Sequence, residues 1–305
     1  MTAPQDIPLA ARPVDRAAHH RLDEDWLAAA FAKDSALVML MRGGAPLMQS
    51  NGGLVWLGAQ AGTLEHVQHR LFLGLDKHGA AIFALDLAEQ FNLDTSPIAG
   101  LGEFVEARGA FSTLGPLEAN LASTARSLFL WHGAHGYCAK CGNPSETAEA
   151  GWKRTCPSCQ TEHFPRTDPV AIMLAVKGDK CLLGRQSMWP PGFYSCLAGF
   201  VEPGETVEQA AARELYEEAG ITASWETAEY LFAQPWPFPS SLMVGLILQA
   251  ETEDITIDEK EIEEARWFTR AEARAIIAGE HDSVYAPPEM AIAHHILKAW
   301  AERDH

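Results

Sequence analysis

The feature that most constrains the fold of this chain is a short acidic helix predicted within residues 199–221. Thr206 can cap such a helix, and Gln209 three residues later completes the pattern of a capping box. Gly220 is a residue type that readily adopts the left-handed conformation at which helices end. These two signals predict a helix of about thirteen residues between them.

Three carboxylates of this helix face one place. At roughly 100° per residue, Glu214, Glu217 and Glu218 fall within an arc of about 100°, and Arg213 lies one turn before Glu217, where the two can pair. A solvated acidic face is the simpler interpretation of such a charge run. However, Glu218 projects toward the positions expected to pack, and like charges this close repel unless a cation compensates. Clustered carboxylates suit Mg²⁺ or Mn²⁺.

The spacing of this stretch matches a known motif. Gly199 is followed after five residues by Glu205, and after seven more by the run RELYEEAGI, which begins at Arg213. The stretch resembles the Nudix box at every defined position. The resemblance implies a Nudix hydrolase, which cleaves a diphosphate linked to another group and uses divalent metal held by these glutamates. We interpret Glu205 as a partner of Arg213 in preference to a metal ligand.

Composition bounds the class of protein. With 305 residues, of which 47% are apolar and 21% charged, the chain is long enough for two domains with buried cores. Its net charge of −18 disfavours nonspecific attraction to nucleic acid or to an anionic membrane. A phosphate-bearing substrate must therefore be bound by metal and a few local cations.

The first twenty residues lack the basic and then apolar organisation of a signal peptide, and no apolar run is long enough to span a membrane. We therefore expect a cytoplasmic protein without a membrane partner.

Four of the six cysteines form two C-x-x-C pairs, which are Cys138 with Cys141 and Cys156 with Cys159. Two such pairs bring four thiolates within tetrahedral reach of one structural Zn²⁺, and four cysteines leave no open position for catalysis. A redox C-x-x-C would not require the second pair. The pattern predicts a zinc ribbon.

The remaining pattern predicts an α+β protein. Residues 36–42, 52–59, 70–76 and 80–87 read as strands of a β-rich N-terminal domain, followed by a helix that begins at Pro116. After the ribbon, a strand over 170–176, strands on both sides of 234–241, short strands near 255–257 and Trp267, and a final amphipathic helix are expected.

Two further features resemble the NADH pyrophosphatase subfamily of Nudix hydrolases: the four-cysteine ribbon and the segment QPWPFPSSLM that begins at Gln234. The resemblance covers about residues 105 to 300 and implies a Nudix α/β/α sandwich domain preceded by the ribbon and the β-rich domain. We expect three domains, at 1–133, 134–165 and 166–305.

The implied reaction is hydrolysis of NADH to reduced nicotinamide mononucleotide and AMP, with NAD⁺ as a poorer substrate. The implied metal ligands are Glu214, Glu217, Glu218, Glu261 and the backbone carbonyl of Ala198. Glu217 and Glu218 are the candidates for the base that accepts a proton from water, and Glu214 supports the same chemistry. The implied substrate contacts are Phe164, Phe200, Gln234, Pro235, Trp236, Pro237, Phe238, Pro239, Ser240, Ser241 and Ala293.

Other functions remain open from the sequence. The same scaffold could act on ADP-ribose or a diadenosine polyphosphate, and related enzymes also remove the nicotinamide dinucleotide cap from the 5′ end of RNA. A noncatalytic zinc-ribbon protein would show a degraded box and a basic face, neither of which is present. Many members of the subfamily are homodimers, so the resemblance also favours a homodimer.

Overall fold

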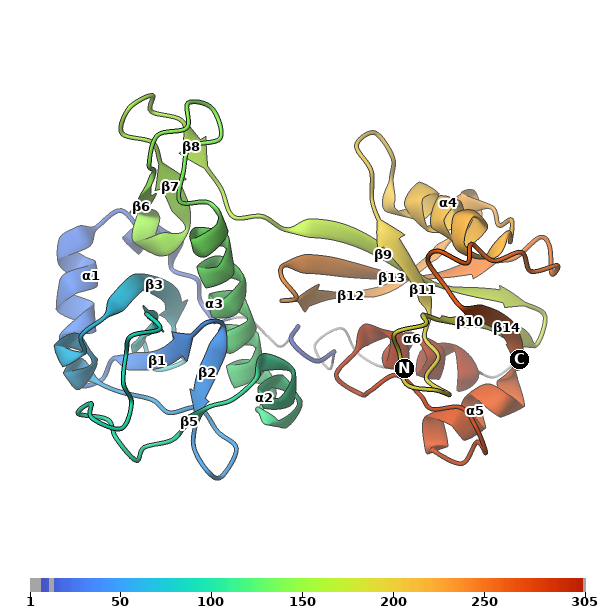
Figure 1. Ribbon diagram of the computed structural model, residues 1–305, viewed down its shortest axis with the longest axis horizontal. Coiled ribbons are helices and arrows are strands. Elements are labelled where there is room, and N and C mark those ends of the chain that lie inside the picture. The colour runs from blue at the N-terminus through green and yellow to red at the C-terminus, as the bar shows by residue number, and fades with distance from the viewer. Residues whose placement is uncertain (1–6, 11–13, 304–305) are drawn as a thin grey trace. The chain divides into compact units, whose positions relative to one another are not determined.

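The computed structural model describes residues 7–10 and 14–303, which divide into two compact units. Unit 1 contains the described residues 7–10, Thr167–Trp236 and 241–303, and unit 2 contains 14–166 and Pro237–Ser240. Each unit has its own sheet (Figure 1). Among the described residues, no helix combines the length and apolar character needed to cross a membrane.

Unit 1 is built on a six-stranded sheet. The path of this sheet runs through β12 (Glu229–Trp236), β13 (Ser241–Gln249), β9 (Asp168–Lys177), β10 (Lys180–Arg185) and β14 (Glu264–Thr269), and β11 (Leu197–Phe200) pairs with β9 beside that path. β13 and β9 are parallel, whereas the other pairs are antiparallel. Its helices are α4 (Val207–Ala219), the 3₁₀ helix η5 (Trp225–Thr227), α5 (Arg270–Ala278) and α6 (Ile292–Ala301).

The central strand β9 explains the layers of unit 1. Side chains alternate between the two faces of a strand. Ala171, Met173 and Ala175 of β9 pack in one buried cluster with Leu215 of α4. Ile172, Leu174 and Val176 pack in a second cluster with Ile276 of α5 and Ile296 of α6. The continuous apolar run of β9 is therefore buried on both faces, which gives the expected α/β/α sandwich.

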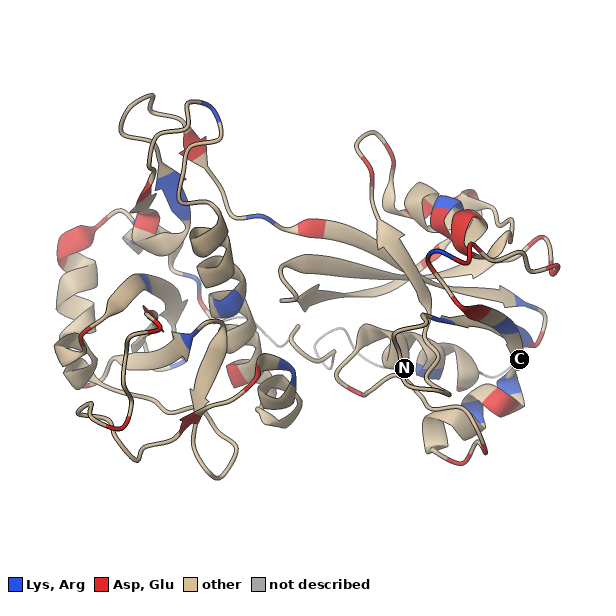
Figure 2. Ribbon diagram, viewed as in Figure 1, with Lys and Arg blue, Asp and Glu red and all other residues tan. Residues whose placement is uncertain are grey.

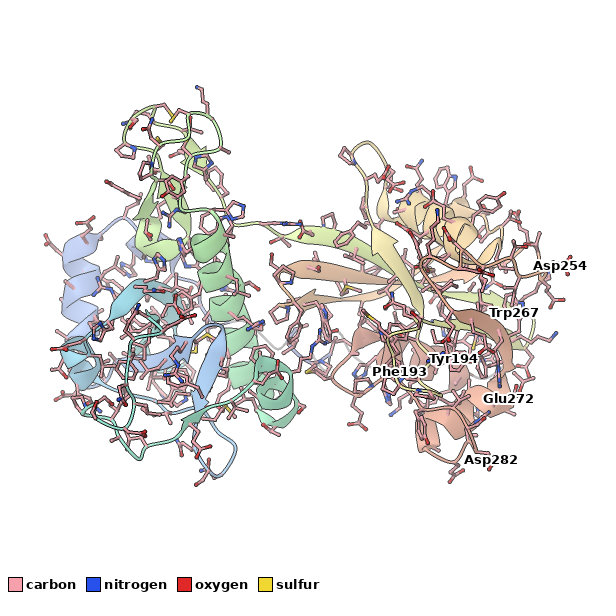
Figure 3. All side chains as sticks on the ribbon, in the orientation of Figure 1. Phe193, Tyr194, Asp254, Trp267, Glu272 and Asp282 are labelled. Atoms are coloured by element: carbon pink, nitrogen blue, oxygen red, sulfur yellow. The ribbon has the colours of Figure 1, made fainter. Side chains whose placement is uncertain are left out.

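Aromatic contacts extend the second cluster to the sheet edge. Tyr194, labelled in Figure 3, packs edge-on against Phe268 of β14 with the ring centroids 5.4 Å apart. The indole N–H of Trp267, on the opposite face of the same strand, donates to the carbonyl of Glu253 at 2.9 Å.

Unit 2 has a five-stranded sheet. The path of this sheet runs through β3 (Val67–Leu75), β4 (Ala81–Leu87), β1 (Leu37–Arg42), β2 (Ala45–Met48) and β5 (Glu103–Phe104). The helices of the unit are η2 (Ala18–His20), α1 (Glu24–Phe31), η3 (Ala59–Thr63), α2 (Ala107–Thr113), α3 (Pro116–Ala134) and η4 (Glu149–Gly151). A separate three-stranded sheet of β6 (Glu146–Ala148), β7 (Lys153–Thr155) and β8 (Glu162–His163) follows α3.

The two large sheets have the same plan. Read in order, β3-β4-β1-β2-β5 corresponds to β12-β13-β9-β10-β14, and in each sheet only the second and third members are parallel. The difference lies in one connection. β11 and α4 separate β10 from β12, whereas between β2 and β3 the structure has only the 3₁₀ helix η3. Unit 2 therefore repeats the sheet without the acidic helix.

The buried side chain of Arg154 joins the small sheet to α3. Its Nε donates to Ser145 Oγ at 2.8 Å, and its NH1 donates to Nδ1 of His132 at 3.0 Å. Nε2 of His132 then donates to the carbonyl of Gly151 at 2.9 Å, because a carbonyl can only accept. Burial lowers the pKa of His132 to about 4, so the ring is neutral, as this arrangement requires.

Most of the expected elements are present, and two are not. Residues 52–59 form isolated bridges at Leu54 and Leu57 instead of a strand, and 255–257 form no strand. Both segments carry alternating apolar residues. These side chains pack in or against the buried clusters, but the backbone forms no continuous ladder with the sheet. The division of the chain into three domains stays a prediction.

Replacing Arg154 with methionine should lower the free energy of unfolding of unit 2 by roughly 2–4 kcal/mol, because buried acceptors on Ser145 and His132 lose their donor. Chemical denaturation of the zinc-loaded protein measures this change. The matched control Lys140→Met removes an exposed charge and should change stability by less than about 0.5 kcal/mol. Equal unfolding midpoints for the two variants would contradict the assignment.

Candidate active site and metal centres

The helix α4 positions the predicted catalytic carboxylates. It begins after Thr206, whose side chain accepts from Gln209 N–H while the side chain of Gln209 accepts from Thr206 N–H. It ends at Gly220, which has a φ of 69°. The predicted limits of this helix are thus confirmed. Figure 2 shows its acidic residues as red bands on the helix.

Three carboxylates meet at this helix. One oxygen each from Glu214, Glu218 and Glu261 lie within 4.8 Å of one another. Glu261 comes from the loop before β14, and this loop is fixed to α4 because the N–H of Asp258 donates to the carbonyl of Glu218 at 3.1 Å. Oxygen donors from three separate carboxylates form a donor set that Mg²⁺ and Mn²⁺ prefer. The residues therefore fit a divalent ion.

Glu218 shows that this group is incomplete without a cation. Glu218 is only 6% exposed, and its Oε2 is buried without a hydrogen-bond partner. Burial, together with the nearby charges of Glu214 and Glu261, raises the pKa of Glu218 to about 8. Burial also raises the pKa of Glu214. A buried carboxylate with a free oxygen is stabilised in its charged form by a nearby positive charge.

Arg213 connects the glutamates around this group. Its guanidinium binds both carboxylate oxygens of Glu205, at 2.6 and 3.1 Å, and also donates to Glu214 at 2.9 Å and Glu217 at 2.8 Å. The Arg213–Glu217 and Arg213–Glu205 pairs expected from the sequence are confirmed. Hydrogen bonding to Arg213 lowers the pKa of Glu205.

Glu217 does not belong to the group of three carboxylates. Its carboxylate pairs with Arg213, and its side chain is half-exposed. The oxygens of Glu217 do not converge with those of Glu214, Glu218 and Glu261, and its role as a metal ligand stays a prediction.

The strand β11 brings its backbone close to the carboxylates. A Cβ atom at Gly199 would lie 1.8 Å from Cδ of Glu214, so only glycine leaves room for that side chain. The backbone of Ala198 favours the charged form of Glu218 and so opposes the effect of burial on its pKa. Ala198, predicted to offer its carbonyl to metal, therefore lies beside the carboxylate group.

A cavity of about 580 Å³ opens beside these groups. It is lined by Gln186, Ser187, Met188, Ala198, Gly199, Phe200, Glu202, Glu214, Glu218, Lys260 and Glu261. Phe200, predicted to contact the substrate, is 57% exposed there. Met188 at 83% exposed is a second apolar side chain on the lining.

The other predicted substrate residues of unit 1 do not line this cavity. Gln234 is fully buried, and its amide donates to the carbonyls of Pro8 and Met290 while accepting from Ile292 N–H. These bonds use both donors of the amide and its carbonyl oxygen. Ala293 is also buried. Pro235, Trp236 and Ser241 lie at the ends of β12 and β13.

The remaining predicted substrate residues belong to unit 2. Pro237, Phe238, Pro239 and Ser240 group with α2 and α3 of that unit. Arg126 donates through Nε to the carbonyl of Pro237 at 2.9 Å, and its guanidinium lies 5.2 Å from the ring centre of Phe238. Arg108 lies over the same ring at 4.2 Å. Phe164, which directly follows β8, is 65% exposed.

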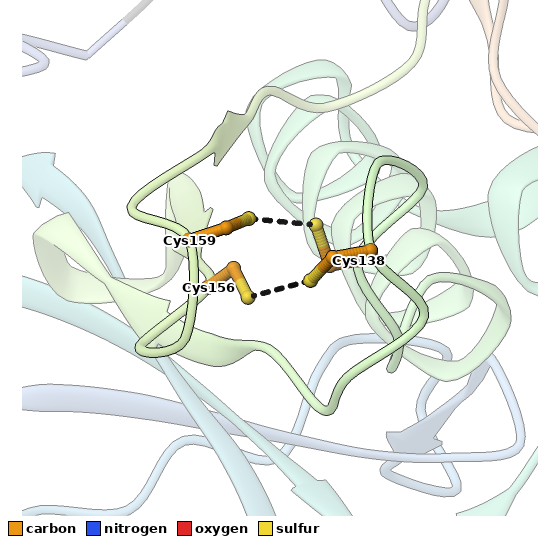
Figure 4. A group of neighbouring side chains, drawn as sticks. Cys138, Cys156 and Cys159 are labelled. Atoms are coloured by element: carbon orange, nitrogen blue, oxygen red, sulfur yellow. Dashed lines mark hydrogen bonds between the residues drawn. The ribbon is translucent and has the colours of Figure 1, made fainter.

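The four ribbon cysteines form the second metal group. The Sγ atoms of Cys138 and Cys159 are 3.6 Å apart, and those of Cys141 and Cys156 are 3.5 Å apart (Figure 4). All four Sγ atoms lie within 4.8 Å of one another. Sulfurs about 2.3 Å from one tetrahedral Zn²⁺ lie at similar separations, so this closed donor set fits a structural zinc ion.

Sequence reasoning missed several residues of the cavity. Gln186, Ser187, Met188, Glu202 and Lys260 line the cavity but were not among the predicted site residues. Only Lys260 had a local signal, because it directly precedes the predicted ligand Glu261.

Three family models match successive parts of the chain. Residues 35–131 match the NADH pyrophosphatase-like rudimentary NUDIX domain, which agrees with a sheet that lacks the acidic helix. Residues 134–164 match the NADH pyrophosphatase zinc ribbon domain, and 165–287 match the NUDIX domain. The four cysteines thus belong to a zinc ribbon and hold structural zinc.

Several relatives of the chain carry descriptive names. It is 44% identical over 194 residues to the human NAD-capped RNA hydrolase NUDT12. The aligned region covers 60% of this chain and 42% of the relative. The chain therefore spans less than half the length of that relative. It is 34% identical to the mouse mitochondrial NAD(P)H pyrophosphatase NUDT13, covering 92% of this chain and 88% of the relative.

A bacterial relative matches along nearly its whole length. The NAD-capped RNA hydrolase NudC of Mycobacterium bovis BCG Pasteur is 36% identical over 307 residues, covering 97% of this chain and 96% of the relative. The box on α4, the zinc ribbon and the rudimentary domain therefore place the chain in the Nudix hydrolase family, within the NADH pyrophosphatase subfamily.

Proposed function

We propose that this protein hydrolyses the diphosphate bond of NADH, and more weakly of NAD⁺, to a nicotinamide mononucleotide and AMP. The observation that carries the proposal is the convergence of Glu214, Glu218 and Glu261 beside an open cavity, with a buried oxygen of Glu218 left without a partner. The names of the relatives support a nicotinamide dinucleotide as the substrate class.

The residues divide the chemistry among them. In the reaction, a water oxygen bonds to one phosphorus, the bond from that phosphorus to the bridging oxygen breaks, and the water proton passes to a base. Glu214, Glu218 and Glu261 would hold Mg²⁺ or Mn²⁺, with Ala198 and Glu217 as the further predicted ligands. When bound, such ions would neutralise charge on the diphosphate and lower the pKa of the attacking water.

Two glutamates are candidates for the base. Glu218 lies within the carboxylate group and resists ionisation, which is the environment that brings a carboxylate pKa near the operating pH. Glu217 is nearer to solvent, and its pairing with Arg213 fixes its orientation. Arg213 acts as a positioning residue because it holds Glu214, Glu217 and Glu205 together.

The same site would serve an NAD-capped RNA, because the cap presents the same diphosphate at a 5′ end. Two of the relatives are named NAD-capped RNA hydrolases, which supports this second substrate. The homodimer and the cytoplasmic location expected from the sequence stay predictions. So do the substrate contacts assigned to Phe164, Phe200, Ala293 and the segment 234–241.

Incubation of the purified protein with NADH and Mn²⁺ should yield AMP and reduced nicotinamide mononucleotide by mass spectrometry. Glu218→Gln should lower turnover by about 100-fold or more, because a charged oxygen donor is lost. Glu226→Gln, an exposed carboxylate of the same unit, is the matched control and should retain full activity. Faster turnover of ADP-ribose than of NADH would contradict the proposed substrate.

Stability without metal should depend on pH through Glu218. In EDTA, this group ionises near 4.5 in the unfolded chain but near 8 in the folded protein, so its contribution to stability is lost as pH rises through that window. At pH 8, Glu218→Gln should therefore be more stable than the wild type by roughly 2–4 kcal/mol. The difference should shrink toward pH 5.

Thermal unfolding across this pH range checks the expectation. Added Mn²⁺ should reverse the order at pH 8, since only the wild type then gains a charged ligand. A wild type that is no less stable than Glu218→Gln at pH 8 in EDTA would refute the buried, cation-dependent carboxylate.

Phe200→Ala should raise KM for NADH about fivefold to tenfold while leaving kcat within about twofold, because a stacking surface is lost and the carboxylates are retained. Steady-state kinetics measures both constants. Tyr230→Ala removes an equally exposed aromatic ring from β12 and is the control. An unchanged KM for Phe200→Ala would remove this ring from the substrate site.

A further inference from the structure

One basic side chain lines the cavity beside the carboxylates. Among the lining residues, Lys260 is the basic one, whereas Glu202, Glu214, Glu218 and Glu261 are acidic. A diphosphate entering this cavity would meet carboxylates of its own sign of charge. Lys260 is therefore the one lining side chain able to attract it directly.

The backbone of Lys260 is held in place by the loop around it. Its N–H donates to Oδ1 of Asp258 at 2.9 Å, and the N–H of Glu261 donates to the carbonyl of Asp258 at 3.0 Å. Asp258 is in turn bonded to the carbonyl of Glu218, and Ile262 is buried in the core. Lys260 is thus fixed at its Cα beside the end of α4.

The ammonium group of Lys260 is not engaged by the protein. Within residues 7–10 and 14–303, its Nζ has neither an ion pair nor a hydrogen bond. By contrast, Lys153 pairs with Glu149 and Glu162. A lysine that stands beside several carboxylates without pairing keeps its three donors available for a ligand.

We propose that Lys260 binds phosphate oxygens of the substrate diphosphate in this cavity. A lysine ammonium is a compact charge on a flexible stem, which suits a tetrahedral phosphate whose position changes as the bridging bond breaks. A local cation also offsets the repulsion from a chain of net charge −18. This inference rests on the proposed function, because it takes a dinucleotide diphosphate as the substrate class.

Three variants separate a substrate contact from a structural role. Lys260→Met removes the charge and keeps the length, Lys260→Arg keeps the charge, and Lys33→Met removes an exposed lysine that does not line the cavity. With Mn²⁺ and NADH, Lys260→Met should raise KM about tenfold, the effect of one lost charge-assisted contact. Lys260→Arg should recover most of this loss, and Lys33→Met should match the wild type.

Two binding measurements accompany the kinetics. The metal-free Lys260→Met protein should bind Mn²⁺ at least as tightly as the wild type, because a positive charge beside the carboxylates is removed; a loop displaced by the substitution would carry Glu261 away and weaken Mn²⁺ binding. Titration of ADP into the Mn²⁺-loaded proteins should show about tenfold weaker binding to Lys260→Met than to the wild type.

The outcomes distinguish the two ideas. If the wild type binds ADP but does not hydrolyse NADH, the proposed substrate fails, and the ADP titration still decides the role of Lys260. If the wild type hydrolyses NADH and Lys260→Met has the same KM and the same ADP affinity, Lys260 is not a phosphate ligand. Weakened Mn²⁺ binding in Lys260→Met, or wild-type protein that neither binds ADP nor hydrolyses NADH, would also overturn the inference.

Discussion

The structure of the catalytic unit depends on holding like charges close together. Glu214, Glu218 and Glu261 bring their oxygens within 4.8 Å of one another, although burial and mutual repulsion both oppose ionisation. Ionised carboxylates this close together persist only where the surrounding structure holds them in place. The capped helix α4, the loop that carries Glu261 and the strand β11 with Gly199 together hold them in place.

Arg213 offsets part of the repulsion among these carboxylates and still leaves one oxygen of Glu218 without a partner. Its guanidinium binds both carboxylate oxygens of Glu205, donates through NH1 to Glu214 and Glu217, and donates through NH2 to the carbonyl of Phe200. It does not reach the free oxygen of Glu218. The guanidinium of Arg213 therefore pairs with carboxylates around the edge of the group. The centre of the group can bind a cation from solution. This division suits an enzyme whose chemistry requires a metal ion at that centre.

The second unit shows what remains when this constraint is absent. Its sheet repeats the strand order and directions of the catalytic unit, but the connection after β2 holds only η3 where the catalytic unit has β11 and α4. The sheet itself is stabilised by apolar packing on both faces and does not need the acidic helix. The neutral ring of His132 and the buried guanidinium of Arg154 link the ribbon to α3 of this unit. The four cysteines contact one another within the ribbon itself.

The sequence by itself determined the local features. Capping residues and Gly220 set the limits of α4, the spacing of Arg213 and Glu217 set their ion pair, and two C-x-x-C pairs defined the ribbon, because each signal acts within a few residues of the chain. Glu261 was found only through family resemblance. Its distance along the chain gives no local signal.

Tertiary structure alone decided which side chains meet. It separated Glu217 from the carboxylate group, buried Gln234 against Pro8 and Met290, and brought Lys260 and Met188 to the cavity. It also left 52–59 and 255–257 as loops, since the alternating pattern of a strand states only that one side can be buried. Whether that side pairs in a sheet depends on neighbours far away in the chain, and periodicity carries no information about them.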